Sequence, residues 1–386
     1  MSVVSSQIPA VETLVDAVDH WAGERGAQIA LDYRSRAGAE PVTLTYAQLS
    51  ASARALAERL SAKGSRGDRV LILLPSGIDY VVALLGCMQA GFIGVPVNLP
   101  GPSRVRRVLG KVGPIAADCT PRFIVTTEEI RRQSQADLEV FAQEAGARVL
   151  ILDPPCDRCS WESAPLRGTD TAFLQYTSGS TGEPKGVVNG HAPLMRNLRF
   201  ISRLLAPKEQ PVVVSWLPLY HDMGLIMGVF APLVAGGKAI ILSPTSFVAD
   251  PLSWLEVAST EGAGMMPCPA FAMDACVENY DAARCASLDL DRVESFIPAA
   301  EPVLPRQVAA FCETFAPHGL RPAAIRPAYG LAEATLLVTT GFEPDGPRLL
   351  AVDAVALEEG RAVPVSESAS GSRTYVSNGA ETDGQD

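Results

Sequence analysis

One short segment near the middle of the chain combines hydroxyl groups, glycines and a lysine. It runs from Tyr176 to Gly186 and reads YTSGSTGEPKG. Glycine lets backbone N–H groups approach an anion without a Cβ in the way, and the hydroxyls and Lys185 add donors and positive charge. The order Gly, Lys, Ser/Thr of a Walker A loop is absent, because Lys185 is followed by Gly186. The segment predicts a phosphate-binding loop that leaves a strand; the alternative is a flexible surface linker, for which this composition is also typical.

A histidine and an aspartate form a second candidate site. His221 and Asp222 lie in the segment WLPLYHDMGL, at the end of a predicted strand over Val212–Trp216. Ligand sites in α/β sheets form where strands end. An imidazole there can orient a carboxylate substrate or stabilise charge, although the residues alone leave open a structural histidine.

A carboxylate and an aromatic ring follow in the segment YGLAEAT, which begins at Tyr329. Glu333 of this segment suits a magnesium ion, which prefers a few protein oxygens together with phosphate oxygens. Tyr329 offers a ring that could stack on a base, but an aromatic residue at a strand end is also common in protein cores. The segment AAEPV, which starts at Ala299, follows another predicted strand, and a plain turn is its alternative.

Alternating strands and helices must position these residues. Thr45 and Gln48 fit a capping box at the start of a helix that ends at Gly64, and Asp250 with Pro251 marks another helix start. We expect helices at Ala10–Gly23, Thr45–Gly64, Ile78–Ala90, Glu128–Ala145, Ala192–Leu204, Met223–Val234, Leu252–Glu261 and Pro305–Phe315. We expect strands at Ile29–Tyr33, Val70–Leu74, Gly94–Val97, Phe123–Thr126, Arg148–Leu152, Phe173–Tyr176, Val212–Trp216, Lys238–Leu242, Ser295–Pro298 and Ala324–Pro327. This alternation predicts an α/β fold with two doubly wound halves.

Composition limits the class of protein. The chain has 386 residues, 47% of them hydrophobic, and a formal net charge of −11, which argues against nucleic acid as a partner. Its eight cysteines are scattered, so reduced thiols in a cytoplasmic protein are expected. Cys156 and Cys159 form a CxxC without a second pair, which we interpret as a loop coincidence with zinc or redox use as the alternative. No charged segment of an export signal is visible, and no membrane span is predicted, because Gln89, glycines and Pro96 interrupt the run Val81–Val97.

The motifs also carry a family resemblance. YTSGSTGEPKG resembles the signature loop of the adenylate-forming enzymes, the superfamily of acyl-CoA synthetases, luciferases and nonribosomal-peptide adenylation domains. WLPLYHDMGL and YGLAEATLLV are most similar to the fatty acyl-AMP ligases. The resemblance implies the large domain of such an enzyme, with α/β subdomains at residues 1–168 and 169–341. It further implies an insertion like that of the acyl-AMP ligases at residues 342–376, for which a disordered terminus is the alternative, and a truncated tail at residues 377–386.

The resemblance also assigns roles to residues. It implies catalytic roles for His221, Lys185 and Glu333, with Glu333 as the magnesium ligand, and substrate contacts from His221, Asp222 and Phe271. For the nucleotide it implies Thr177, Ser178, Gly179, Ser180, Thr181, Gly182, Lys185, Ala300, Glu301, Pro302, Tyr329, Gly330, Leu331 and Ala332. The chain departs from the family at Ala299, where glycine is usual. It also departs at Ala270 and Met273 in the segment that resembles the acyl-tunnel wall, which core packing would explain as well.

The implied activity has two stages. With ATP and Mg²⁺, a fatty acid becomes acyl-AMP, and the acyl group then moves to the phosphopantetheine thiol of an acyl carrier protein. The family's small C-terminal lid, with its catalytic lysine, lies beyond Asp386, so we expect binding of nucleotide and fatty acid with weak or no turnover. An acyl-CoA synthetase of the same fold and a non-catalytic nucleotide- or acyl-binding module are the alternatives.

Overall fold

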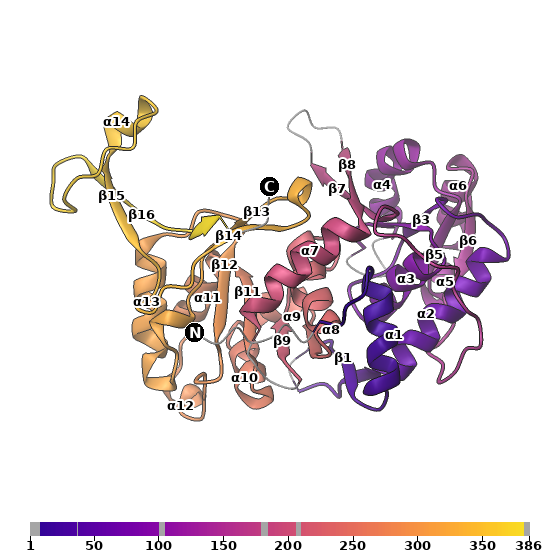
Figure 1. Ribbon diagram of the computed structural model, residues 1–386, viewed down its shortest axis with the longest axis horizontal. Coiled ribbons are helices and arrows are strands. Elements are labelled where there is room, and N and C mark those ends of the chain that lie inside the picture. The colour runs from indigo at the N-terminus through magenta and orange to yellow at the C-terminus, as the bar shows by residue number, and fades with distance from the viewer. Residues whose placement is uncertain (1–7, 37, 100–104, 179–183, 206–209, 382–386) are drawn as a thin grey trace.

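Two six-stranded sheets organise the chain (Figure 1). The computed structural model describes residues 8–36, 38–99, 105–178, 184–205 and 210–381. The first sheet has the order β6 (Arg148–Ile151), β5 (Phe123–Thr126), β3 (Arg69–Ile72), β4 (Ile93–Pro96), β7 (Thr171–Ser178) and β8 (Pro184–Gly190). The second has the order β12 (Ser295–Ala299), β11 (Met265–Pro269), β9 (Val212–Ser215), β10 (Lys238–Leu242), β1 (Ile29–Arg34) and β2 (Val42–Thr45). Pairing is parallel except for β8 on β7 and β2 on β1.

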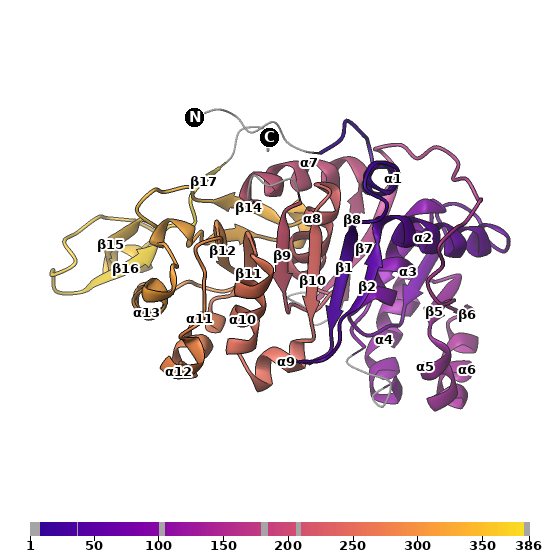
Figure 2. The same ribbon diagram turned by 90° about the horizontal axis from the view of Figure 1, so that it is seen from below.

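Helices lie on either side of the strands, as Figure 2 shows from below. They are α1 (Leu14–Glu24), α2 (Tyr46–Ser61), α3 (Ile78–Gln89), α4 (Val105–Cys119), α5 (Glu128–Gln133), α6 (Gln135–Glu144), α7 (His191–Ile201), α8 (Ala231–Val234), α9 (Pro244–Ala249), α10 (Leu252–Glu261), α11 (Phe271–Glu278), α12 (Ala282–Cys285) and α13 (Pro305–Phe315). The α/β architecture predicted from the alternation of elements is confirmed. In the part of the chain that the structure describes, no helix combines the length and the apolar character needed to cross a membrane.

The start of α2 shows how local sequence sets an element boundary. Thr45 Oγ1 accepts a hydrogen bond from the Gln48 amide at 3.3 Å, and Gln48 Oε1 accepts one from the Thr45 amide at 3.1 Å. This reciprocal pair satisfies two amides that the first helical turn leaves without partners. The predicted capping box is confirmed.

The two sheets exchange strands across the middle of the chain. The β7–β8 ribbon, which follows the predicted boundary at residue 168, belongs to the first sheet, whereas β1 and β2 from the first 45 residues belong to the second. In Figure 2 the indigo β1 lies beside β10, with which it pairs in parallel. The boundary between residues 168 and 169 therefore does not separate the sheets, because strand pairing here is non-local.

One predicted strand is wrong. Of the predicted strand Ala324–Pro327, Ala324 ends a 3-10 turn, η5 (Pro322–Ala324), and a single parallel bridge joins Ile325 to Phe296. The next strand, β13 (Ala328–Gly330), begins only after Pro327. Proline lacks the N–H that a ladder needs, so the flanking prolines limit pairing to this bridge. The predicted helix Glu128–Ala145 is likewise two helices, α5 and α6, which Ser134 separates.

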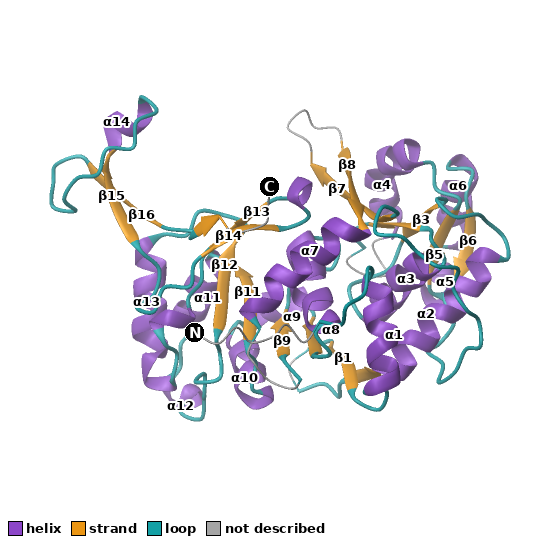
Figure 3. Cartoon of the chain, viewed as in Figure 1, coloured by secondary structure: helices purple, strands orange, loops and turns teal. Residues whose placement is uncertain are grey.

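Residues 342–376 form a projecting hairpin rather than an unstructured segment. Strands β15 (Leu349–Asp353) and β16 (Ser372–Val376) pair antiparallel, and the short helix α14 (Ala354–Glu358) lies between them. Figure 3 shows this hairpin extending away from the body of the molecule. The following residues enter a small sheet of β13, β14 (Leu337–Thr340) and β17 (Ala380–Glu381).

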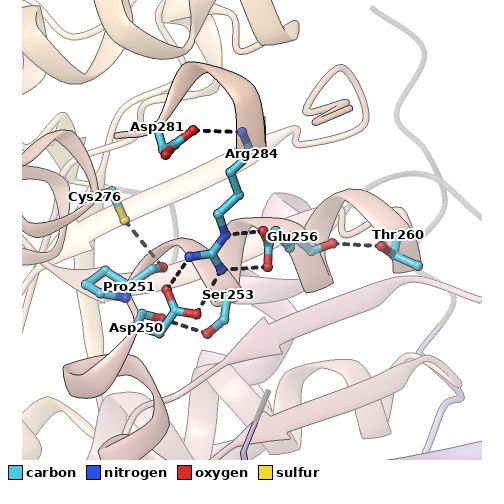
Figure 4. Close-up of polar contacts among 8 residues, drawn as sticks. All are labelled: Asp250, Pro251, Ser253, Glu256, Thr260, Cys276, Asp281 and Arg284. Atoms are coloured by element: carbon cyan, nitrogen blue, oxygen red, sulfur yellow. Dashed lines mark hydrogen bonds and ion pairs between the residues drawn. The ribbon is translucent and has the colours of Figure 1, made fainter. Parts of the chain in front are cut away.

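An ion-pair network joins α10 to α12 (Figure 4). The Arg284 guanidinium donates to both carboxylate oxygens of Asp250 at 2.8 Å, and its Nη2 lies 2.8 Å from Glu256 Oε2. The hydrogen bond from Arg284 lowers the pKa of Asp250. Helix α10 has the predicted bounds. The carboxylate of Asp250, which the sequence pattern associates with the start of this helix, binds Arg284 of α12.

Candidate functional site

The described ends of the predicted phosphate-loop segment belong to an antiparallel ribbon. Strands β7 and β8 pair Thr177 with Lys185 and Ser178 with Pro184, and the ribbon projects at the top of Figure 1. Lys185 is exposed at the start of β8. The predicted nucleotide-binding residues Gly179, Ser180, Thr181 and Gly182 lie outside the described residues. Strand β8 was not expected, because Pro184 and the glycines favoured a loop.

Two hydrogen bonds fix the ribbon to its surroundings. The Tyr176 hydroxyl donates a hydrogen bond to the Asp118 carboxylate of α4. Burial of the hydroxyl is the main cause of the raised pKa of Tyr176, and the hydrogen bond to Asp118 is the second cause. The phenol therefore stays neutral and acts as the donor. Gln175 Nε2 donates to the Tyr220 carbonyl at 2.6 Å. Since Tyr220 precedes His221, this contact joins the loop-bearing ribbon directly to the histidine segment. The sequence motifs gave no indication of it; the only signal was a polar residue within an apolar strand.

His221 and Asp222 form a hydrogen-bonded pair. His221 Nδ1 lies 2.8 Å from Asp222 Oδ1, and the His221 side chain is 52% exposed against 13% for Asp222. The hydrogen bond to Asp222 raises the pKa of His221. With a proton held on Nδ1 by the carboxylate, Nε2 is the ring nitrogen available to a ligand. The exposure of His221 makes it an accessible group rather than a core histidine.

A π-helix begins directly after this pair. The Asp222 carboxylate accepts from the Met223 amide at 2.7 Å and so caps η3 (Met223–Phe230), the first part of the helix predicted over Met223–Val234. A Cβ on Gly224 would lie 2.4 Å from the Pro218 carbonyl oxygen, so only glycine fits this close approach. π-helical segments are rare and are frequent at functional sites, and this one of eight residues follows the His221–Asp222 pair directly.

Glu333 lies next to the strand that carries Lys185. It occupies the 3-10 turn η6 (Ala332–Ala334), which contacts β8. Its side chain is exposed and makes no hydrogen bond or ion pair with another described residue. The Asn197 side chain of α7 holds the end of this segment, since it donates to the Leu337 carbonyl at 2.8 Å and accepts from the Leu337 amide at 3.1 Å.

The other residues predicted from YGLAEAT surround this turn. Tyr329 is 51% exposed on β13, which removes the core interpretation for its ring. A Cβ on Gly330 would come within 1.9 Å of the Leu336 carbonyl oxygen, so the tight return of the chain requires glycine. Leu331 is also exposed, whereas Ala332 is buried.

The segment AAEPV connects the end of β12 to the predicted acyl-binding phenylalanine. Glu301 Oε1 accepts from the Phe271 amide at 2.7 Å, at the start of α11. Ala300, Glu301 and Pro302 are all exposed. The carboxylate of Glu301 thus positions α11, a role that the sequence did not indicate.

Phe271 is the exposed end of an aromatic cluster. Its ring is 46% exposed and lies edge-on to Trp216 with 5.9 Å between ring centroids. Trp216 stacks on Phe247 at 3.8 Å, and its buried Nε1 has no hydrogen-bond partner among the described residues. Because Trp216 opens the segment WLPLYHDMGL, this cluster provides an apolar wall beside the His221 segment.

The exposed charges fit a nucleotide that carries a magnesium ion. Among the described residues no group of three or more His, Cys, Asp or Glu side chains could hold a metal by itself. Magnesium is often held by one or two carboxylates together with phosphate oxygens and water, and Glu333 beside the ribbon predicted to bind phosphate has the chemistry for such a site. Lys185, on the ribbon that adjoins Glu333, is an exposed cation of the kind that pairs with phosphate.

Comparisons with known proteins agree with this site. The model of the AMP-binding enzyme family matches residues 18–367. The chain is 33% identical over 361 residues to the medium-chain-fatty-acid–[acyl-carrier-protein] ligase JamA of Moorena producens, covering 93% of this chain and 61% of that protein. It is 37% identical over 359 residues to the long-chain-fatty-acid–AMP ligase FadD26 of Mycobacterium marinum, covering 91% and 61%.

Solved structures give the same result. The crystal structure of the fatty acid AMP ligase from Legionella pneumophila superposes with a TM-score of 0.87 at 33% identity, covering 96% of this chain and 64% of that one. A structure of the fatty acyl-adenylate ligase from L. pneumophila in complex with acyl adenylate and pyrophosphate gives 0.85 at 33% identity, with the same coverage of 96% and 64%. The chain spans about 61% of the length of the curated relatives JamA and FadD26. With its fold, its motifs and a family match over most of its length, the chain belongs to the AMP-binding enzymes.

Proposed function

We propose that this chain binds ATP, Mg²⁺ and a fatty acid and serves the formation of fatty acyl-AMP, from which the acyl group passes to an acyl carrier protein. The observation that carries the proposal is the contact of Gln175 with the Tyr220 carbonyl, which brings the phosphate-loop ribbon to the His221–Asp222 pair. The turn that carries Glu333 lies against the same ribbon. The names of the relatives, which are fatty-acid–AMP and fatty-acid–carrier-protein ligases, support this choice of substrate.

In the first step, a carboxylate oxygen of the fatty acid attacks the α-phosphorus of ATP. A bond from that oxygen to phosphorus forms, the bond to the bridging oxygen breaks, and pyrophosphate leaves with the electron pair. Lys185 offsets the charge that grows on the phosphates. The protonated imidazole of His221, which Asp222 favours by raising the pKa of His221, donates from Nε2 to the fatty carboxylate and orients it. A magnesium ion, when bound at Glu333, would supply further neutralisation of phosphate charge.

In the second step, the phosphopantetheine thiolate of a carrier protein attacks the acyl carbonyl. A thioester bond forms and the carbonyl–phosphate bond breaks, so AMP leaves with the electron pair. Trp216, Phe247 and Phe271 form the apolar wall for the acyl chain. All eight cysteines are free thiols, which supports a cytoplasmic location as part of the proposal.

Product analysis by mass spectrometry tests this function. The chain is incubated with Mg·ATP and medium- to long-chain fatty acids, with and without CoA. We expect a low yield of acyl-AMP that persists when CoA is present, because the chain spans about 61% of its relatives' length. Formation of acyl-CoA would instead favour an acyl-CoA synthetase of the same fold.

Binding of ATP, measured by calorimetry, provides a second readout that needs no turnover. The substitution Lys185→Ala should weaken Mg·ATP binding at least tenfold, since a charge-assisted contact to phosphate contributes about 1.5–3 kcal/mol. Lys63→Ala removes the same charge from another exposed position and serves as the matched control. Equal affinities for the two variants would remove Lys185 from the proposed site.

A further inference from the structure

A large groove lies beside the site, along the exposed face of α7. Its volume is about 1060 Å³. Ala334 and Thr335 also line the groove and directly follow Glu333, so the groove adjoins the proposed nucleotide site. The reaction steps described above do not use this groove.

Arginines line the groove. Arg196, Arg199 and Arg203 are spaced by three and four residues and therefore share one face of α7 and the 3-10 turn η2 (Ser202–Leu204) that continues it. Arg167 faces the groove from the loop before β7. All four side chains are exposed. We call Arg196, Arg199 and Arg203 the arginine stripe.

Few carboxylates neutralise the positive charge of these arginines. Arg199 donates to the Val11 carbonyl at 2.8 Å, Arg203 lies over the Phe200 ring, and none of the stripe pairs with a carboxylate among the described residues. Glu12 also lines the groove, where its carboxylate accepts from the Gly168 amide at 3.1 Å. Four arginines against one glutamate make this groove basic in a chain whose formal net charge is −11. The groove is therefore positively charged although the whole chain is negatively charged, and it suits an anionic partner.

Besides the nucleotide and the fatty acid, the proposed reaction brings one further anionic partner to this site, the carrier protein with its phosphopantetheine arm. A phosphopantetheine arm carries a phosphodiester close to its attachment point, and its thiol must reach the acyl carbonyl. Guanidinium groups bind phosphate oxygens through paired N–H donors, and a row of them also attracts carboxylates. We propose that this groove docks the phosphopantetheine-bearing carrier protein. The arginine stripe contacts the arm's phosphodiester and acidic side chains around it, and the thiol enters at Ala334 and Thr335. This inference rests on the proposed function.

Binding of a purified acyl carrier protein to this chain tests the assignment. The affinity of the holo form, which carries the arm, and of the apo form, which lacks it, is measured by calorimetry at low and high salt. We expect tighter binding of the holo form and weaker binding at high salt, because exposed charges are screened. The triple variant Arg196→Ala, Arg199→Ala, Arg203→Ala should raise the dissociation constant for the holo form at least tenfold and reduce its advantage over the apo form.

A matched control removes the same charge elsewhere. Arg132, Arg158 and Arg306 are exposed and outside the groove, and their combined replacement by alanine should change the affinity less than twofold. Thermal unfolding of both triple variants checks that each is folded. If the two triple variants bind the holo carrier equally well, or if wild-type binding is the same with and without the arm, the assignment is wrong.

Acyl-AMP formation separates this inference from the proposed function. That step does not involve the carrier, so the triple variant of the stripe should yield as much acyl-AMP as the wild type. A wild-type chain that binds the carrier through the stripe yet forms acyl-CoA in place of acyl-AMP would contradict the proposed function alone. A stripe variant that loses acyl-AMP formation while keeping carrier affinity would assign the arginines to the nucleotide and overturn the docking proposal.

Discussion

Ala300 has a backbone conformation that residues other than glycine rarely adopt. Its φ is +66°, and the family resemblance led us to expect a glycine one position earlier, at Ala299, which instead ends β12. A Cβ in the left-handed region costs about 1–2 kcal/mol, while glycine loses about 0.5–1 kcal/mol more than alanine through unfolded-chain entropy. Ala300→Gly should therefore raise the free energy of unfolding by roughly 0.5–1 kcal/mol in a urea titration. Ala299→Gly, in the strand, should lower it, and equal effects of both changes would show that Ala300 is not strained.

The His221–Asp222 pair predicts a pH dependence. Because Asp222 raises the pKa of His221, the folded state binds a proton more tightly than the unfolded state does. The resulting stabilisation is fully present below the unfolded pKa of about 6.5 and is lost as pH rises through the higher folded pKa. Asp222→Asn keeps an oxygen to cap η3 but removes the charge, so NMR titration should give a lower pKa for His221. An unchanged pKa would assign the shift to another cause.

At the residue scale, the sequence indicated which residue types belong to the candidate site, but it did not indicate which side chains contact one another. The exposure of His221, Lys185, Glu333 and Tyr329 agrees with their prediction as site residues, whose roles remain predictions. The contact between Gln175 and the Tyr220 carbonyl joins positions 45 residues apart. No local pattern encodes such a contact, because it depends on which strand lies beside which loop.

The arginine network between α10 and α12 gives a prediction at the scale of elements. Arg284 binds two carboxylates, but all three side chains are about one third exposed, so solvent screens the pairs. We expect Arg284→Met to lower the free energy of unfolding by about 1 kcal/mol at low salt and by less at high salt. Arg306→Met on α13, where the arginine has no carboxylate partner among the described residues, is the control. A loss that salt does not reduce would point to packing of the arginine stem.

Elements were predictable where apolar periodicity was unbroken. The bounds of α10, α13 and β10 agree with those expected from sequence. Helix α4 was missed because Pro114 and two glycines interrupt its pattern, although its apolar face is buried at Val108, Leu109 and Val112. Strand β8 is stabilised by its pairing with β7, and no property of residues 184–190 predicts that pairing.

At the scale of the whole molecule, the order of strands in the sheets was the feature that sequence could not supply. Alternation of strands and helices predicts parallel sheets, but pairing of β1 with β10 joins segments more than 200 residues apart. The twelve strands of the two large sheets are therefore shared between sequence halves. The chain should behave as one cooperative unit.

Separate halves of the chain should consequently fail to fold. A fragment of residues 1–168 lacks β7 and β8 of its sheet, and a fragment of residues 169–386 lacks β1 and β2. Each loses the hydrogen bonds and apolar cover of two strands, and the net stability of about 5–15 kcal/mol typical of a whole domain leaves little margin for that loss. Circular dichroism should show no cooperative thermal transition for either fragment alone.

Cleavage of the intact chain supplies the control. A protease site placed in the exposed loop between β6 and β7 breaks the chain after the strands have paired, and the two pieces should elute together in size-exclusion chromatography. The cut itself then cannot account for the failure of the separate fragments. A sharp unfolding transition in either isolated fragment would show instead that one sheet is stable without the strands from the other half, and that the boundary near residue 168 divides independent folding units.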